Sequence, residues 1–346
     1  MASYNLMHPL CHDSSHRTVR CMSFSCMFHL LVYVPPPVLI TRRLTMNSVA
    51  REKFHPENRA TMIFHLLRRS AALLATCAMS LIAASGASAA EDASPWDGDA
   101  RSAVRLIAGS STVPEHAAIR AGIAIRLKNG WHTYWRYPGD AGVPPRFGFA
   151  GSQNVNSVEV RWPAPQRIAE QGVVAIGYAD DFILPLAIVP QDPAKPVKLR
   201  LKLDYAVCER LCVPAEGQAE LVLTGGRSAH DAALAAAEAR VPKKAALGEG
   251  SPLAIKSVRR ELTGSRPRVI VDIAAPSTTQ VDLFAEGPTP EWALPVPTAV
   301  EGAPAGRQRF AFDLDGAPPG ATYDGARIAL TAVAGDSAIE VTARLD

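Results

Sequence analysis

The sequence from residue 91 onward is poor in the side chains that bind metals and carry out most catalysis. All seven methionines of the chain fall in residues 1–90, and only two cysteines and three histidines follow them. These five residues are Cys208, Cys212, His116, His132 and His230. Neither a methionine-rich copper site nor a cysteine–histidine zinc cluster can be built from this set. Glycine-rich nucleotide-binding motifs and the G-x-S-x-G motif are also lacking, so we expect no metal and no cofactor.

The same part of the chain has no excess of basic residues. Residues 91–346 contain 27 basic and 30 acidic residues, a net charge near −3, although the whole chain carries +3. Proteins that bind nucleic acid use a basic surface to neutralise its phosphates. The charge balance therefore excludes nucleic acid as a partner.

Residues 62–90 are organised like a secretory signal peptide. Arg68 and Arg69 form a basic start, an apolar stretch follows, and the small residues Ala87–Ala89 precede a predicted cleavage site. A lipoprotein anchored at Cys77 fits less well, because Thr76 is a poor residue before a lipidated cysteine. The small-residue tail also argues against a retained membrane helix. We therefore predict export to the periplasm with cleavage of residues 62–90.

Residues 1–61 precede this signal, at a position where an exported protein requires nothing. We interpret them as a non-native or disordered extension, with Met46 or Met62 as the true start. Disulfides persist in the compartments outside the cytoplasm. The two downstream cysteines are therefore expected to be oxidised unless a dedicated partner reduces them.

From about Ala103, short runs of alternating apolar and polar residues are separated by turn residues. In Ile119–Leu127 every odd position is apolar, the pattern of a strand with one face on a core. A helical stretch, Ala229–Val241 with Ser228 as its N-cap, separates two sets of such runs. We predict an all-β chain of two tandem immunoglobulin-like sandwiches joined by a short helical connector. The predicted boundaries are 95–226 for the first sandwich, 228–246 for the linker and 250–346 for the second sandwich.

The densest aromatic cluster of the chain follows the turn at Gly130. Strand alternation puts Trp131, Thr133 and Trp135 on one face and His132 and Tyr134 on the other. One set of rings can therefore fill the core while the other shelters a site. The Pro- and Gly-rich segments that follow are predicted to be long loops, which commonly carry function. These segments are Asp140–Pro145 and Pro163–Gly177.

Cys208 and Cys212 are separated by three residues, enough for a tight loop that brings their Cα atoms to the roughly 5.5–6 Å of a disulfide. Closing so short a loop stabilises little, well below the roughly 3 kcal/mol of a 15-residue loop. The spacing leaves a reversible redox pair, a structural staple and inert thiols all open, because CxxxC is a weaker pattern than CxxC. Arg210 would favour a thiolate, and Glu209 would oppose it.

Three stretches resemble the N-terminal periplasmic domain of the thiol:disulfide interchange protein DsbD, in particular its ScsB-like variant linked to copper tolerance. They are Gly130–Gly142 (GWHTYWRYPGDAG), Gly177–Pro185 (GYADDFILP) and Tyr205–Pro214 (YAVCERLCVP). The resemblance covers roughly Ala103–Thr224. It implies an immunoglobulin-like domain that passes electrons from a membrane-embedded thiol reductase to periplasmic thioredoxin-like or disulfide isomerase proteins. The second sandwich resembles the tandem domain of the ScsB type.

The resemblance also implies roles for single residues. Cys208 and Cys212 occupy the positions of the active pair, with Cys212 forming the mixed disulfide with a partner. Tyr134 falls beside the cysteines. The segment Glu170–Tyr178 falls where the family has a shielding cap, with Tyr178 as the candidate for its aromatic residue. The remaining supporting candidates are His132 and Arg210.

Two other functions are compatible with the residues. One is a non-catalytic binding or chaperone-like sandwich with a structural disulfide. The other is a copper-tolerance protein that binds Cu(I) through the two thiols, a ligand type that Cu(I) prefers. The membrane and thioredoxin-like domains with which the family usually continues are missing from this sequence, so the redox interpretation implies a separate electron donor.

Overall fold

The computed structural model describes residues 91–346 apart from 112–117, 140–141, 171 and 264–265. The predicted extension and signal peptide, residues 1–90, lie outside the described residues. The described part contains four sheets and one helix, and its elements all fall in one compact unit, Ala84–Asp346. That helix is too short to cross a membrane.

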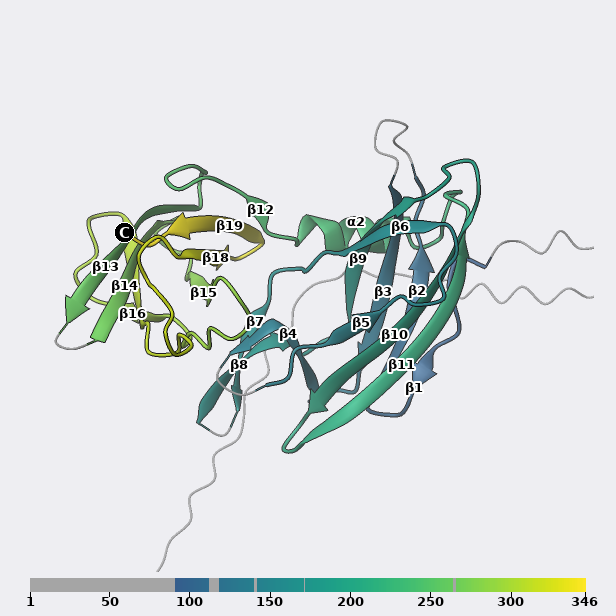
Figure 1. Ribbon diagram of the computed structural model, residues 1–346, viewed down its shortest axis with the longest axis horizontal. Helices are drawn as coiled ribbons and strands as arrows, with labels where there is room; N and C mark the ends of the chain where they lie inside the picture. Colours follow the sequence, from purple (N-terminus) through teal and green to yellow (C-terminus); the bar gives the residue numbers. More distant parts are fainter. Residues whose placement is uncertain (1–90, 112–117, 140–141, 171, 264–265) are drawn as a thin grey trace, which may run out of the picture. The chain divides into compact units, whose positions relative to one another are not determined.

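Two sheets make up the first sandwich (Figure 1). One has the order β1-β2-β3-β9-β6, and the other has the order β11-β10-β4-β8-β7 with β5 also paired to β10. The strands are β1 (Asp97–Gly98), β2 (Ser102–Ala108), β3 (Ile119–Leu127), β4 (His132–Gly139), β5 (Arg146–Gly148), β6 (Val155–Val160), β7 (Gln166–Glu170), β8 (Val173–Tyr178), β9 (Phe182–Pro190), β10 (Val197–Cys208) and β11 (Cys212–Leu223). Alternating apolar residues of both sheets, such as Ile123 and Leu203, share one core. The alternation predicted for 119–127 is therefore confirmed.

The helix α2 (Asp231–Ala239) covers the outer side of the first sheet beside β9 (Figure 1). Leu234 is fully buried against Ile107 and Ala124. A Cβ at Gly122 would lie 2.7 Å from Cδ2 of Leu234, so a glycine is needed where the helix approaches the sheet. The alanine-rich sequence hid this contact, because a single leucine provides it.

The predicted N-cap of this helix is wrong. The helix begins after His230 rather than after Ser228, and its N-cap makes no side-chain hydrogen bond. The Ser228 hydroxyl instead accepts a hydrogen bond from the backbone N–H of His230 at 3.0 Å. The Asp231 carboxylate accepts one from the N–H of Ser110 at 2.7 Å, which fastens the start of the helix to the first sandwich.

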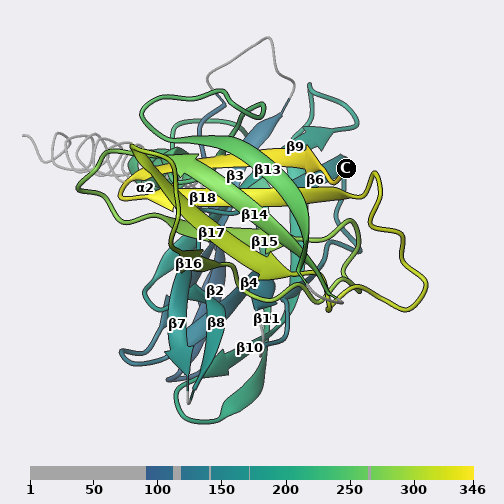
Figure 2. The same cartoon turned by 90° about the vertical axis from the view of Figure 1, so that its left-hand side faces the viewer.

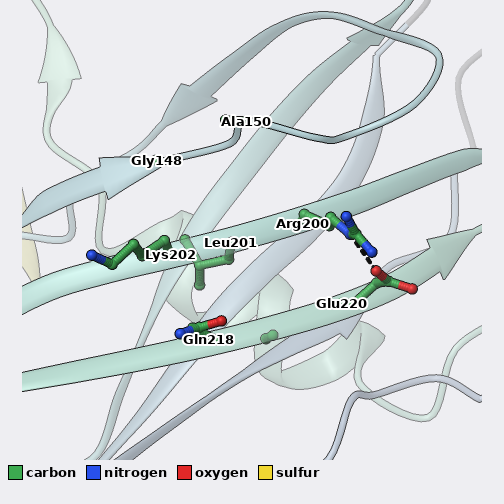
Figure 3. A pocket seen from close by; sticks show the side chains of 8 residues that line it. Gly148, Ala150, Arg200, Leu201, Lys202, Gln218 and Glu220 are labelled. Atoms are coloured by element: carbon green, nitrogen blue, oxygen red, sulfur yellow. Dashed lines mark hydrogen bonds and ion pairs between the residues drawn. The ribbon is translucent and has the colours of Figure 1, made fainter.

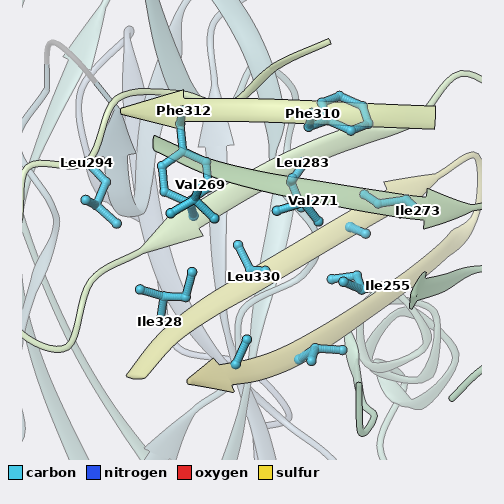
Figure 4. Close-up of a cluster of buried hydrophobic side chains, with 14 of the residues drawn as sticks. Ile255, Val269, Val271, Ile273, Leu283, Leu294, Phe310, Phe312, Ile328 and Leu330 are labelled. Atoms are coloured by element: carbon cyan, nitrogen blue, oxygen red, sulfur yellow. The ribbon is translucent and has the colours of Figure 1, made fainter. Parts of the chain in front are cut away.

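The second sandwich is built from two sheets as well, but each of these has four strands. Their orders are β12-β19-β18-β15 and β13-β14-β17-β16. Its strands are β12 (Lys243–Lys244), β13 (Ala254–Thr263), β14 (Arg266–Ala274), β15 (Asp282–Glu286), β16 (Thr298–Val300), β17 (Arg307–Asp313), β18 (Arg327–Ala334) and β19 (Ser337–Arg344). In Figure 2, β13, β14 and β17 run side by side. Side chains of both sheets, among them Val271, Phe312 and Leu330, meet in one core (Figure 4).

The predicted loop Pro163–Gly177 is wrong in part, because it contains the hairpin β7–β8. In β8, the large residues Val174, Ile176 and Tyr178 alternate with Ala175 and Gly177. Small residues are weak strand formers by themselves, so the strand is hard to recognise in the sequence. Its pairing with β4 and β7 stabilises it instead.

A buried carboxylate in the second sandwich gives a pH-dependent prediction. Asp272 is 2% exposed and accepts hydrogen bonds from Arg309 Nε at 2.6 Å and from Arg259 Nη1 at 3.2 Å. The hydrogen bond from Arg309 is the main cause that lowers the pKa of Asp272 from 3.8 to about 2. Because the pKa is lower in the folded state, the stabilisation is complete above about pH 4, and about 2 kcal/mol is lost as the pH falls through 2.

Urea unfolding of the wild type and of Asp272→Asn, each at pH 5 and at pH 2.5, measures this contribution. We expect the free energy of unfolding of the wild type to fall more steeply with acidification than that of the variant. Parallel pH profiles would show that Asp272 does not contribute.

Candidate functional site

The two cysteines close the end of the long hairpin formed by β10 and β11. The strands pair without a break from Val197–Leu223 to Cys208–Cys212, and a three-residue turn joins them. The cysteines form a disulfide with a Cα–Cα distance of 4.1 Å. This distance is shorter than the 5.5–6 Å predicted, because the cysteines face each other directly across two strands, where closely spaced pairs lie about 4.5 Å apart.

The two cysteines differ in exposure. Cys208 is fully buried, whereas Cys212 is exposed. Next to Cys212, the turn residue Leu211 is 78% exposed, although it is a large apolar side chain. The disulfide therefore has one buried and one exposed cysteine, and the exposed one lies beside an apolar tip.

Tyr134 lies against the disulfide. Its Oη is 3.0 Å from Sγ of Cys208 and 3.0 Å from Sγ of Cys212. The sulfurs of a disulfide carry no proton, so the tyrosine hydroxyl is the donor. The ring is 2% exposed, and a Cβ at Gly142 would lie 2.7 Å from its Cδ1 and Cε1 atoms. The chain at Gly142 thus covers the ring.

His132 borders the same cluster. It is the Cα partner of Cys208 in the pairing of β4 with β10, and it is 5% exposed. Its ring makes an edge-on contact with Tyr134, with the centroids 5.8 Å apart and the planes at 90°. Arg210 is exposed in the turn between the cysteines. The structure thus brings His132 and Tyr134 together with the cysteine pair.

Tyr178 is not placed as a shield of the cysteines. It stacks on Phe182 with a centroid distance of 4.1 Å and packs in a buried cluster with Trp135. Its hydroxyl donates to the carbonyl oxygen of Pro163 at 2.8 Å, and burial raises its pKa well above the ordinary value. Strand alternation explains the error, because Gly177 pairs with Tyr134 and the next residue points to the other face.

Ile168 and Ala175 of the β7–β8 hairpin pack in the disulfide cluster instead. They are Cα partners in that hairpin, so both project from the face that carries Tyr134 and Cys208. Neither these two residues nor Gly142 had been expected near the cysteines. A usable signal was the alternation of large with small residues in Val174–Tyr178, which leaves room for a ring on one face.

A separate hollow of about 650 Å³ lies along the same hairpin, away from the disulfide (Figure 3). It is lined by Gly148, Ala150, Arg200, Leu201, Lys202, Gln218, Ala219 and Glu220. Arg200 and Lys198 both form ion pairs with Glu220. This lining contains no thiol, imidazole or hydroxyl group that could react. In the part of the chain that the structure describes, no group of three or more His, Cys, Asp or Glu residues is arranged to hold a metal ion.

No curated protein sequence matches the chain significantly. The crystal structure of the N-terminal periplasmic domain of ScsB from Proteus mirabilis is similar, with a TM-score of 0.57 and 18% identity over 73% of this chain and 98% of that chain. At this identity the similarity concerns the fold alone. Its coverage exceeds the first sandwich and therefore extends into the second.

Residues 103–224 match the family described as "Thiol:disulfide interchange protein DsbD, N-terminal". This range contains both cysteines and the described side chains of the buried cluster around Cys208. The three stretches that resembled the family in the sequence also fall within it. The match to the DsbD N-terminal family therefore covers the whole region around the disulfide.

Proposed function

We propose that the protein is a periplasmic thiol:disulfide interchange protein that relays electrons through a reversible Cys208–Cys212 disulfide. Its electron donor would be a membrane-embedded thiol reductase, and its clients would be periplasmic thioredoxin-like or disulfide isomerase proteins. One observation carries the proposal: a disulfide in a domain of this family has one exposed cysteine and one that is buried beneath a tyrosine hydroxyl. Arg210, in the turn, would favour the thiolate form of the pair.

Reduction would proceed in two steps. A thiolate of the donor attacks Sγ of Cys212, the Cys208–Cys212 bond breaks, and Cys208 leaves as a thiolate. A second thiolate of the donor then attacks the donor sulfur of the mixed disulfide and releases Cys212. The donor is oxidised to a disulfide, and the pair gains two electrons.

Transfer to a client would reverse these steps. The Cys212 thiolate attacks the client disulfide and forms a mixed disulfide, and one client sulfur leaves as a thiolate. Cys208 then attacks Sγ of Cys212, which restores the Cys208–Cys212 bond and releases the second client sulfur. The client is reduced by two electrons. Because Cys208 is buried, it would act only within the protein.

A purely structural staple explains the geometry less well. The hairpin already holds the two cysteines opposite each other through twelve consecutive residue pairs. A disulfide between adjacent ends of such a ladder closes a very short loop and removes little unfolded-state entropy, well below the roughly 3 kcal/mol of a 15-residue loop. Stability alone therefore gives little reason for a disulfide at this position.

We also propose a topology, domain boundaries and an export signal for the chain. We assign an immunoglobulin-like topology to both sandwiches, with domains at 95–226 and 250–346 and a linker at 228–246. Export through a signal peptide at 62–90 would bring the domain into the compartment in which this chemistry is needed.

A redox titration tests the proposal. The purified protein is equilibrated with glutathione buffers of graded potential, and the thiol state of Cys208 and Cys212 is then fixed by alkylation. We expect a potential above roughly −300 mV, the value below which structural disulfides typically lie. A disulfide that stays closed far below this potential would instead indicate a structural staple.

A further inference from the structure

Strand β4 is held from both faces. Tyr134 points to the disulfide, while the next residue, Trp135, points to the other face and is fully buried. There it packs against Phe284 of the second sandwich, with the ring centroids 5.9 Å apart. Val296 of the second sandwich belongs to the same buried cluster. The residue that touches the sulfurs is therefore adjacent in the chain to an anchor in the second sandwich.

Arg136 adds an ionic anchor to the same strand. It donates to Glu286 from Nη2 at 2.7 Å and from Nε at 2.9 Å, and Nη2 also donates to Glu340 at 2.5 Å. Lys244 forms a further ion pair with Glu340. The side chains of Glu286 and Glu340 are only 17% and 7% exposed. A paired, partly buried guanidinium in this geometry fixes orientation as well as charge.

The β7–β8 hairpin shows the same arrangement. Ile168 packs in the disulfide cluster, while the preceding residue, Arg167, reaches the second sandwich. Arg167 donates to Asp282 at 2.9 Å and to the carbonyl oxygens of Leu283 at 2.9 Å and Pro297 at 2.7 Å. Strands β4 and β7 both cover the disulfide. In each of them, a residue close to the covering side chain is anchored in the second sandwich.

A third contact continues the anchoring along β4. The Tyr137 hydroxyl donates to the carbonyl oxygen of Leu294 at 2.6 Å. Farther along the chain, Gly142 and Pro144 line a cleft of about 430 Å³ whose other wall includes Pro288 and Thr289 of the second sandwich. The segment that leads from β4 to the cover over Tyr134 therefore runs beside the second sandwich throughout its described part.

We propose that the second sandwich is a clamp that positions Tyr134 and Ile168 over the disulfide and so keeps Cys208 inaccessible to other thiols. Arg136 and Arg167 are its positioning residues. This inference rests on the proposed function, and it gives the second sandwich a task in the same reaction. With the clamp intact, an incoming partner can reach only Cys212, which sets the order of the exchange steps.

The clamp is tested by measuring the labelling rate of each of the two cysteines in the Arg136→Met variant. The protein is reduced, the reductant is removed, and iodoacetamide labelling is followed over time. Trypsin cleaves after Arg210, so each cysteine is quantified in its own peptide. We expect the labelling rate of Cys208 to rise by roughly two- to thirtyfold, the range in which substitutions within coupled networks act. The rate of Cys212 should stay nearly constant.

The matched control is Arg120→Met. Arg120 is 27% exposed and forms ion pairs with Glu238 and Asp231, much as Arg136 is 28% exposed and pairs with two carboxylates. It fastens α2 rather than β4, so its variant should leave both labelling rates unchanged. If Arg136→Met does not fold, Glu286→Gln weakens the same anchor from the second sandwich.

The double variant Tyr134→Ala with Arg136→Met shows whether the clamp protects Cys208 through the ring of Tyr134. In the Tyr134→Ala background the cover is already absent, so adding Arg136→Met should not accelerate Cys208 labelling further. If Arg136→Met accelerates Cys208 labelling in this background as much as it does in the wild type, the clamp does not act through Tyr134. If glutathione reduces the disulfide but Arg136→Met labels like the wild type, the clamp is refuted and the relay stands. A disulfide that glutathione does not reduce refutes both.

Discussion

Cys212→Ser is expected to abolish electron transfer to client proteins, whereas Cys208→Ser should accumulate stable mixed disulfides with them. Cys212 is the exposed member of the pair, so in the proposed relay its loss would remove the first step. The fully buried Cys208 would be needed only to resolve the intermediate. Without it, Cys212 still attacks a client disulfide, but no second thiolate is placed to release the product.

The two variants are compared by expressing each in the periplasm and quenching the cells with acid. Mixed disulfides are then separated by non-reducing electrophoresis and identified by mass spectrometry. We expect covalent partners with Cys208→Ser, almost none with Cys212→Ser, and none after reduction. The reverse pattern would assign the attacking role to Cys208. Normal client reduction by the double serine variant would favour the binding or chaperone-like alternative.

The tight loop between the cysteines and the tyrosine beside them could be predicted from the sequence because their signals are local. Two cysteines with three residues between them, after an alternating run, already predict a tight loop at this point of the chain. The family stretch that contains Tyr134 placed this ring beside them, and the structure puts its hydroxyl 3.0 Å from both sulfurs. The alternation in Ile119–Leu127 likewise matched the core face of β3.

The rest of the site depends on contacts between distant residues, which leave no local pattern. Tyr178 was the candidate for the aromatic residue of the cap because it is aromatic and ends the segment that falls where the family has its cap, but its face is set by the register of β8 on β4. Nothing near Arg136 in the sequence identifies Glu286, 150 positions away, as its partner. The burial of Leu234 depends in the same way on Gly122 in a distant strand.

Tyr134→Phe should slow the attack of the reduced protein on disulfides and make the potential of the pair more negative. In the oxidised protein the hydroxyl donates to sulfur atoms, which are weak acceptors. After reduction it can donate to a thiolate, and a hydrogen bond to a charged group contributes about 1.5–3 kcal/mol. The variant should therefore react roughly 4- to 20-fold more slowly at neutral pH, because the smaller thiolate fraction is partly offset by the greater nucleophilicity of a more basic thiolate. Because the lost hydrogen bond stabilises the reduced pair more than the oxidised one, the reduction potential should become up to roughly 30–60 mV more negative.

Tyr205→Phe is the matched control for this variant. Tyr205 is 5% exposed on β10, and its hydroxyl forms a 2.8 Å hydrogen bond with Ser102 rather than with sulfur. Both variants lose one buried hydroxyl, so both should lose a similar amount of stability in urea unfolding. Only Tyr134→Phe should change the glutathione potential and the alkylation rate of Cys212. If the two variants shift these quantities equally, the hydroxyl of Tyr134 supports only the fold. A shift confined to Tyr134→Phe would place this hydroxyl among the groups that govern the reactivity of the disulfide.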